Sequence, residues 1–178
     1  LVRENSNLKN ISNFPVEVFE GDLRNRMSLE RALADCQNLF HVAADYRLWV
    51  PDPDTMHAIN VEGTRSLITA ASNAGLEHIV YTSSVATLGL TADGTPANEE
   101  TPCSLESVVG NYKRSKFLAE QVVMQLTQEL SLPLVIVNPS TPIGPGDVRP
   151  TPTGRLVVDA LTERMPAYVN TGLNIAHV

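Results

Sequence analysis

The chain has 178 residues, of which 43% are hydrophobic and 19% are charged, and its formal net charge is −7. This length and composition are typical of a globular protein with a hydrophobic core of its own. The net negative charge argues against binding to nucleic acid or to anionic membranes, both of which attract basic surfaces. The two cysteines, Cys36 and Cys103, are too few for a disulfide framework and lack metal-ligand spacing, so no metal site is expected.

Targeting and membrane signals give a further expectation. No apolar run approaches the roughly 20 residues that a membrane-spanning helix needs, and no signal peptide opens the chain. We therefore expect a cytoplasmic protein. Both ends of the sequence resemble strands that have been cut, so we expect the chain to be a segment of a longer protein.

Strand-like and helix-like segments alternate along the chain. Strands are expected over residues 16–19, 38–44, 78–82 and 134–137, and helices over residues 28–33, 54–74 and 112–130. Short apolar strands that alternate with helices are typical of a parallel sheet covered by helices. The pattern predicts an α/β fold with a doubly wound, Rossmann-like parallel sheet.

The composition of the sequence changes after Pro139. Several prolines mark a loop, and residues 154–165 have a helical pattern that leads into a different region. We expect a partial dinucleotide-binding domain over residues 1–150. Residues 151–178 are then the beginning of a smaller substrate domain.

A pair of segments carries the main chemical signal. Ser83 and Ser84 follow an apolar strand, while Tyr112 and Lys116 lie four residues apart in a predicted helix and therefore share one face of it. A tyrosine gives or takes a proton, a neighbouring lysine lowers the pKa of its phenol, and a serine orients the substrate oxygen. Alone, a Tyr/Lys pair at this spacing is more often a solvated helix face. Its combination with the serines indicates carbonyl reduction or alcohol oxidation.

Together these residues resemble a known family. The chain is similar to the extended short-chain dehydrogenase/reductase superfamily, in the group of NAD-dependent epimerases/dehydratases and dihydroflavonol reductases. The matching segments, in family order and spacing up to about residue 150, are Gly21-Asp22-Leu23, His41-Val42-Ala43-Ala44, Asn60-Val61-Glu62-Gly63-Thr64, Tyr81-Thr82-Ser83-Ser84, Tyr112 with Lys116, Asn138-Pro139 and Gly144-Pro145-Gly146-Asp147. Residues 43–49 and 166–168 further resemble the hopanoid-associated sugar epimerases.

The resemblance implies roles for individual residues. Ser84, Tyr112 and Lys116 are the expected catalytic residues, and Lys116 is also expected to hold the nicotinamide ribose. The residues expected to bind the cofactor are Arg3, Asp22, Leu23, Val42, Ala43, Ala44, Asn60, Ser83, Tyr112, Lys116, Pro139 and Ser140. Among them, Asp22 and Leu23 flank the adenine, Ala43 and Ala44 let the cofactor approach the backbone, and Asn60 braces a strand end.

The chain also departs from the family pattern. The family begins with a strand and a Gly-rich turn that receives the pyrophosphate at a helix N-terminus. This chain has no such turn, and we expect it to precede Leu1. In the family, an acidic residue at the end of the second strand binds the ribose hydroxyls and selects NAD. This chain has Val2 and then Arg3 there, and the guanidinium of Arg3 suits a 2′-phosphate, so NADP is favoured over NAD.

The sequence favours an NAD(P)-dependent oxidoreductase or epimerase that acts on a sugar or sugar nucleotide. Val85 follows Ser84 where an acidic residue would favour dehydration, so dehydration is disfavoured. A dihydroflavonol reductase-like ketone or aldehyde reductase and a non-catalytic nucleotide-binding module remain alternatives. The expected partners are a small-molecule substrate and a second copy of the chain, paired through the helices over residues 54–74 and 112–130.

Overall fold

The computed structural model describes residues 1–148, 150–168 and 170–178, which form two compact units. The first unit contains residues 1–6 and 17–138, and the second contains residues 7–16 and 139–178. The division into domains at residue 150 stays a prediction.

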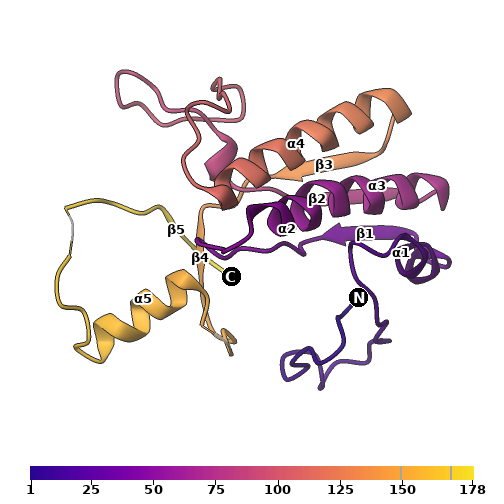
Figure 1. The fold of residues 1–178 in the computed structure, drawn as a ribbon, viewed down its shortest axis with the longest axis horizontal. Helices are drawn as coiled ribbons and strands as arrows, with labels where there is room; N and C mark the ends of the chain where they lie inside the picture. Colours follow the sequence, from indigo (N-terminus) through magenta and orange to yellow (C-terminus); the bar gives the residue numbers. More distant parts are fainter. Residues whose placement is uncertain (149, 169) are drawn as a thin grey trace. The chain divides into compact units, whose positions relative to one another are not determined.

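A three-stranded parallel sheet forms the centre of the first unit (Figure 1). Its strands lie in the order β1 (Asn38–His41), β2 (His78–Thr82) and β3 (Leu134–Val137). Because all the strands are parallel, their carboxyl ends share one edge of the sheet, which is where ligands bind in such folds. The predicted parallel α/β architecture is confirmed, and β2 and β3 have the predicted bounds.

Helical segments connect the strands, and in Figure 1 α3 and α4 run beside the strands. The helical elements of the first unit are α1 (Arg26–Leu33), α2 (Pro53–His57), the π-helical turn η1 (Ala58–Glu62), α3 (Gly63–Asn73), the 3₁₀ turn η2 (Val85–Thr87) and α4 (Asn111–Leu130). The single helix expected over residues 54–74 is therefore interrupted by a widened turn. That turn contains Asn60, and such turns are frequent at functional sites.

The core lies between the sheet and the helices α3 and α4. Ile68 of α3, Val123 of α4 and Ile79 of β2 are almost completely buried there. Side chains of the opposite sheet face are open to solvent, since Phe40 is 72% and Val135 is 59% exposed. In the part of the chain that the structure describes, the sheet is thus an incomplete version of the doubly wound arrangement.

Two local predictions were wrong. Residues 16–19 do not form a strand: beside them the structure has only an isolated parallel bridge between Val2 and Glu20, with the Val2 N–H donating to the Phe19 carbonyl oxygen. The helix expected over residues 28–33 begins earlier, at Arg26, because Asn25 caps it: its side chain accepts a hydrogen bond from the backbone N–H of Ser28.

The second unit is small. It contains a two-stranded parallel sheet of β4 (Thr141–Ile143) and β5 (Ile175–His177) and the helix α5 (Pro152–Leu161). The side chain of Thr151 caps α5 by accepting from the backbone N–H of Gly154. Residues 141–143 were expected to be loop because of Pro142, but a proline is tolerated in so short a two-stranded sheet.

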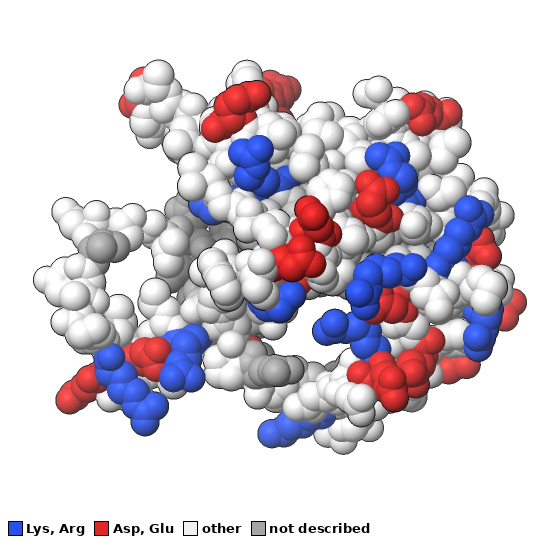
Figure 2. All heavy atoms as spheres, in the orientation of Figure 1, with Lys and Arg blue, Asp and Glu red and all other residues white. Residues whose placement is uncertain are grey.

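Figure 2 shows acidic and basic side chains mixed over the face in view. Among the helices that the structure describes, none has the length and the hydropathy required to cross a membrane.

His41, the last residue of β1, is a buried polar residue in the core. It is 2% exposed, its Nε2 pairs with Thr64 Oγ1 at 2.8 Å, and its ring centroid is 5.4 Å from that of Tyr81. Burial, and after it the positive charge of Lys116, lowers the pKa of His41 to about 3. The imidazole is therefore neutral in the folded protein across the physiological pH range.

This neutral histidine should make the folded protein sensitive to mild acid. Below pH 6.5 His41 becomes protonated in the unfolded chain but stays neutral in the folded protein. The free energy of unfolding therefore decreases as the pH falls, until His41 is protonated in the folded protein as well, at about pH 3. Between pH 6.5 and 5 the whole protein should lose about 1.5–2 kcal/mol of unfolding free energy through this group, measured by urea denaturation.

The control for this prediction is His78→Gln, because His78 is exposed and should leave the pH dependence unchanged. His41→Asn should flatten it. An equal pH dependence in wild type and His41→Asn would contradict the assignment.

Candidate active site

The candidate site lies where β2 ends and α4 begins, at the carboxyl edge of the sheet. Ser83 and Ser84 directly follow β2. Gly110 caps the start of α4 with a φ of 94°, a conformation that favours glycine, and it turns the chain so that Tyr112 lies in the first turn of the helix. Ser84, Tyr112 and Lys116, which the sequence analysis singled out, converge here.

Lys116 is the most constrained residue of the site. It is 4% exposed, and its Nζ donates to the Tyr81 hydroxyl at 3.1 Å and to the Thr82 carbonyl oxygen at 2.8 Å. An ammonium group has three N–H donors, so one N–H of Lys116 has no hydrogen-bond partner among the described residues. Burial lowers the pKa of Lys116 to about 8, and the negative charge of Glu120 opposes this fall. The lysine is therefore predominantly an ammonium at neutral pH.

Tyr81 is a site residue that the sequence analysis missed. It was expected only as a residue of a strand, yet its hydroxyl accepts from Lys116, and the Lys116 Nζ lies 4.7 Å from the centroid of its ring. Burial raises the pKa of the Tyr81 phenol. The available signal was that successive side chains of a strand point to opposite faces of the sheet. Ile79 and Tyr81 of β2 therefore lie on the same face, the one that the helices cover.

Tyr112 and Ser84 form the second part of the site. Burial raises the pKa of the Tyr112 phenol, and hydrogen bonding with the Ser84 side chain opposes that rise. Ser84 Oγ also accepts from the backbone N–H of Ala86 at 3.1 Å, which fixes the direction of the hydroxyl. At neutral pH Tyr112 is thus a protonated phenol beside a fixed serine hydroxyl, as a proton donor to a substrate oxygen requires.

Asn60 connects the loop after β1 to α4. Its side chain accepts from the Asp45 backbone N–H at 2.7 Å and donates to the Asp45 carbonyl oxygen and to Ser115 Oγ, both at 2.8 Å. Ser115 Oγ in turn donates to the carbonyl oxygen of Tyr112 at 2.7 Å. The amide therefore fixes the start of α4 relative to the end of β1.

Asp22 and Leu23, which are expected to flank the adenine, closely follow Glu20, the residue that forms an isolated parallel bridge with Val2. Asp22 binds Arg24 through its carboxylate at 2.8 Å, which is the main cause that lowers the pKa of Asp22 to about 2. The positive charge of Arg3 contributes to the low pKa of both Asp22 and Asp45. Arg3 is exposed, and it has no ion pair among the described residues. Leu23 is buried beside them.

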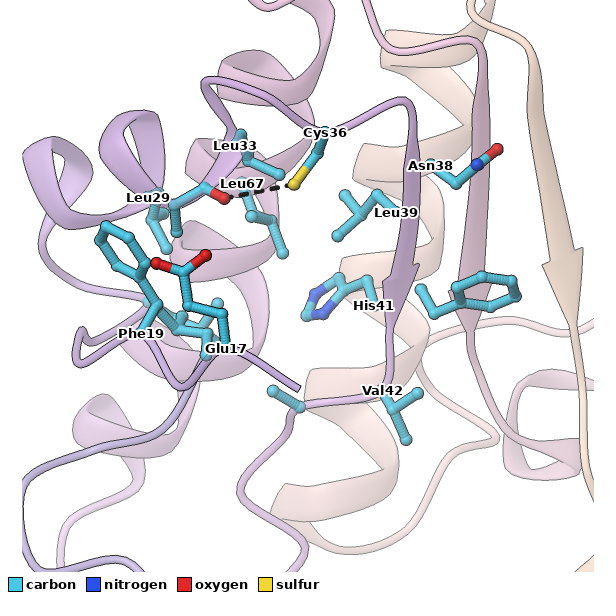
Figure 3. Close-up of a pocket in the computed structure, with 15 residues that line it drawn as sticks. Glu17, Phe19, Leu29, Leu33, Cys36, Asn38, Leu39, His41, Val42 and Leu67 are labelled. Atoms are coloured by element: carbon cyan, nitrogen blue, oxygen red, sulfur yellow. Dashed lines mark hydrogen bonds between the residues drawn. The ribbon is translucent and has the colours of Figure 1, made fainter. Parts of the chain in front are cut away.

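A pocket of about 480 Å³ lies along β1 and is shown in Figure 3. Phe19, His41 of β1, and Leu29 and Leu33 of α1 are among the residues around it. Three of the residues expected to bind the cofactor also line this pocket, whereas the expected catalytic residues do not; the three are Leu23, Val42 and Ala43. The pocket therefore borders the expected cofactor residues near β1, and its lining does not include the expected catalytic residues.

The remaining expected residues are less informative. Ala44 is half-buried directly after Ala43 in the loop that follows β1. The Ser83 hydroxyl is buried and has no hydrogen-bond partner among the described residues. Pro139 and Ser140 begin the second unit, where both are half-buried. Their expected contact with a cofactor stays a prediction.

Comparison with known proteins gives matches along most of the chain. The family model described as NAD dependent epimerase/dehydratase matches residues 1–172. A putative dihydroflavonol 4-reductase of Synechocystis sp. is 47% identical over all 178 residues, which cover 51% of that protein. Among solved structures, the crystal structure of gox2253 matches with a TM-score of 0.93 and 56% sequence identity. The match covers 99% of this chain and 53% of the gox2253 chain.

A more distant structure, the UDP-glucose 4-epimerase of Thermus thermophilus in complex with NAD, is 25% identical with a TM-score of 0.76 over 88% of this chain and 50% of that protein. The chain thus spans about half the length of the proteins it matches. The match of the family model over residues 1–172, together with these relatives, shows that the chain belongs to the NAD dependent epimerase/dehydratase family.

Proposed function

We propose that the whole protein is an NAD(P)-dependent oxidoreductase or epimerase that acts at a hydroxyl or carbonyl carbon of a sugar or sugar nucleotide. The observation that carries the proposal is the convergence of Ser84, Tyr112 and a buried Lys116 with a spare N–H at the carboxyl edge of the sheet. The family assignment and the NAD named in the structure of the related epimerase support the cofactor class.

The residues present fit such a cofactor. The buried Ser83 hydroxyl lacks a partner among the described residues, and Lys116 has one free N–H, so both can bind ribose hydroxyls. Ala43 and Ala44 leave the backbone after β1 accessible, and Pro139 and Ser140 are proposed to contact the nicotinamide. When bound, the nicotinamide supplies the hydride chemistry of the reaction.

The chain's own groups then handle the proton. Tyr112 donates its phenolic proton to the substrate oxygen during reduction and takes it back during oxidation. The Lys116 ammonium stabilises the phenolate that forms, and Ser84 orients the substrate oxygen beside it. A bound nicotinamide would lose its hydride to the product in a reductase and would be regenerated within the reaction in an epimerase.

The second candidate is a dihydroflavonol reductase-like reductase of a ketone or aldehyde. It is favoured by the name of the Synechocystis relative, which is 47% identical. Consumption of NADPH without its regeneration would separate this activity from epimerisation. The resemblance of residues 43–49 and 166–168 to hopanoid-associated sugar epimerases stays a proposal, as do the homodimer and the cytoplasmic location.

One prediction of this proposal concerns the proton donor. In the whole protein, Tyr112→Phe should lower kcat by about 10²- to 10⁴-fold, because a positioned general acid contributes that much. The Kd of the cofactor, measured by fluorescence titration, should stay close to that of wild type. Lys116→Ala should impair both quantities, since Lys116 serves both.

Lys113→Ala is the matched control, because Lys113 is exposed on the same helix turn. It should behave as wild type. Full activity of the Tyr112→Phe protein would refute the mechanism.

Another prediction of this proposal concerns cofactor choice. The free guanidinium of Arg3 should make the whole protein bind NADPH about tenfold or more tightly than NADH, because a hydrogen bond to a charged group is worth about 1.5–3 kcal/mol. Arg3→Ala should remove this preference, while Arg26→Ala, which loses only a surface ion pair with Glu30, should keep it. Equal affinities in the wild-type protein would show that Arg3 does not face the cofactor.

A further inference from the structure

Glu120 connects three elements behind the candidate site. It lies on α4 one turn beyond Lys116 and two turns beyond Tyr112, so all three side chains share one face of the helix. Its Oε2 accepts from Thr87 Oγ1 and from Asn138 Nδ2, both at 2.9 Å. Thr87 belongs to η2, and Asn138 follows the end of β3. Glu120, Thr87 and Asn138 were not among the expected site residues.

The hydrogen bonds around Glu120 require an acceptor there. The Asn138 amide nitrogen can only donate, and it faces Glu120 Oε2, Thr87 Oγ1 and the Ser84 carbonyl oxygen. Thr87 has one hydroxyl proton, which it shares between the Ser84 carbonyl oxygen at 2.7 Å and Glu120. These three protons match the three acceptors when Oε2 is unprotonated. The effect of Glu120 on the Lys116 pKa is that of a negative charge.

This charge acts on Lys116. The direct partners of Lys116 Nζ are the neutral Tyr81 hydroxyl and the Thr82 carbonyl oxygen, and the nearby His41 is neutral as well. Tyr112, on the same helix face, is a protonated phenol at neutral pH. Glu120 is thus the negative charge that opposes the effect of burial on the Lys116 pKa.

The same carboxylate restrains the turn that carries Ser84. Thr87 and Asn138 both bond the Ser84 carbonyl oxygen, at 2.7 and 3.3 Å, and both are held by Glu120. Thr87 is 4% exposed, so solvent does not replace these bonds. A displacement of Glu120 would therefore loosen the turn from which the Ser84 hydroxyl reaches Tyr112.

We propose that Glu120 is a positioning residue with two separable effects on the site. Its charge keeps Lys116 in the ammonium form, and its hydrogen bonds with Thr87 and Asn138 hold the turn that carries Ser84. The inference rests on the proposed function of Ser84, Tyr112 and Lys116.

Glu120→Gln in the whole protein tests the charge, because glutamine keeps an acceptor oxygen of the same reach. Without the carboxylate, Lys116 should lose its proton at lower pH. The alkaline limb of the pH profile of kcat should therefore move to lower pH by about one unit, and NMR titration of the Lys116 side chain should move with it. Below this limb, kcat should stay close to wild type. Glu129→Gln, an exposed change on the same helix, is the control.

Thr87→Val tests the hydrogen bonds, because it removes one hydroxyl and leaves the charge of Glu120. It should lower kcat by about fivefold, because the Ser84 carbonyl oxygen loses the hydrogen bond from Thr87, without moving the alkaline limb. If Glu120→Gln does not fold, Glu120→Asp is measured in its place. Aspartate keeps the negative charge, but its shorter side chain does not reach Thr87, so Glu120→Asp should resemble Thr87→Val.

The outcomes separate this inference from the proposed function. An unmoved Lys116 titration in Glu120→Gln, or a moved one in Glu120→Asp, would overturn the charge effect, and an unchanged kcat in Thr87→Val would overturn the hydrogen-bond effect. Full activity of Tyr112→Phe would instead refute the proposed function, and the Lys116 titration by NMR would still report on Glu120.

Discussion

The buried ammonium of Lys116 is the constraint on which the candidate site depends. A charge removed from water must find partners inside the protein, or its pKa shifts until it is neutral. Here the partners are the Tyr81 hydroxyl and the Thr82 carbonyl oxygen, both at the end of β2. The end of the strand and the first turns of α4 are thereby held together, and this places Tyr112 beside Ser84.

The parallel sheet explains why residues so distant in the chain meet. All three strands end at the same edge of the sheet. Asp45, Ser83 and Asn138, each in the segment after a different strand, are therefore brought to that edge. Side-chain amides then fix the loops to α4, Asn60 through Ser115 and Asn138 through Glu120. Hydrogen bonds of these two amide groups therefore tie the loops of the site to α4.

Sequence patterns were sufficient where the chemistry is local. The four-residue spacing of Tyr112 and Lys116 and the position of Ser84 after an apolar strand indicated that these side chains meet, because helix and strand periodicity are short-range properties. The patterns failed where a distant partner decides. Residues 16–19 alternate like a strand but have no neighbouring strand to pair with among the described residues.

Contacts across long stretches of sequence account for what was missed. The Tyr81 hydroxyl is bound by Lys116, and Glu120 binds Thr87, in each case across more than 30 residues. No local pattern contains such a pairing. Asp22 was expected to face the adenine, and its pairing with Arg24 depends on a side-chain conformation that spacing does not determine.

The central claim is that the free N–H of Lys116 is directed to the ribose of a nicotinamide cofactor while Tyr112 faces the reacting carbon. The most direct test is a crystal structure of the whole protein with NADP⁺ bound. The account predicts that Lys116 Nζ keeps its bond to the Thr82 carbonyl oxygen and approaches a ribose hydroxyl to about 3 Å. It also predicts that the Tyr112 hydroxyl lies beside the nicotinamide. A cofactor bound away from the end of β2, with Lys116 contacting only Tyr81 and Thr82, would contradict it.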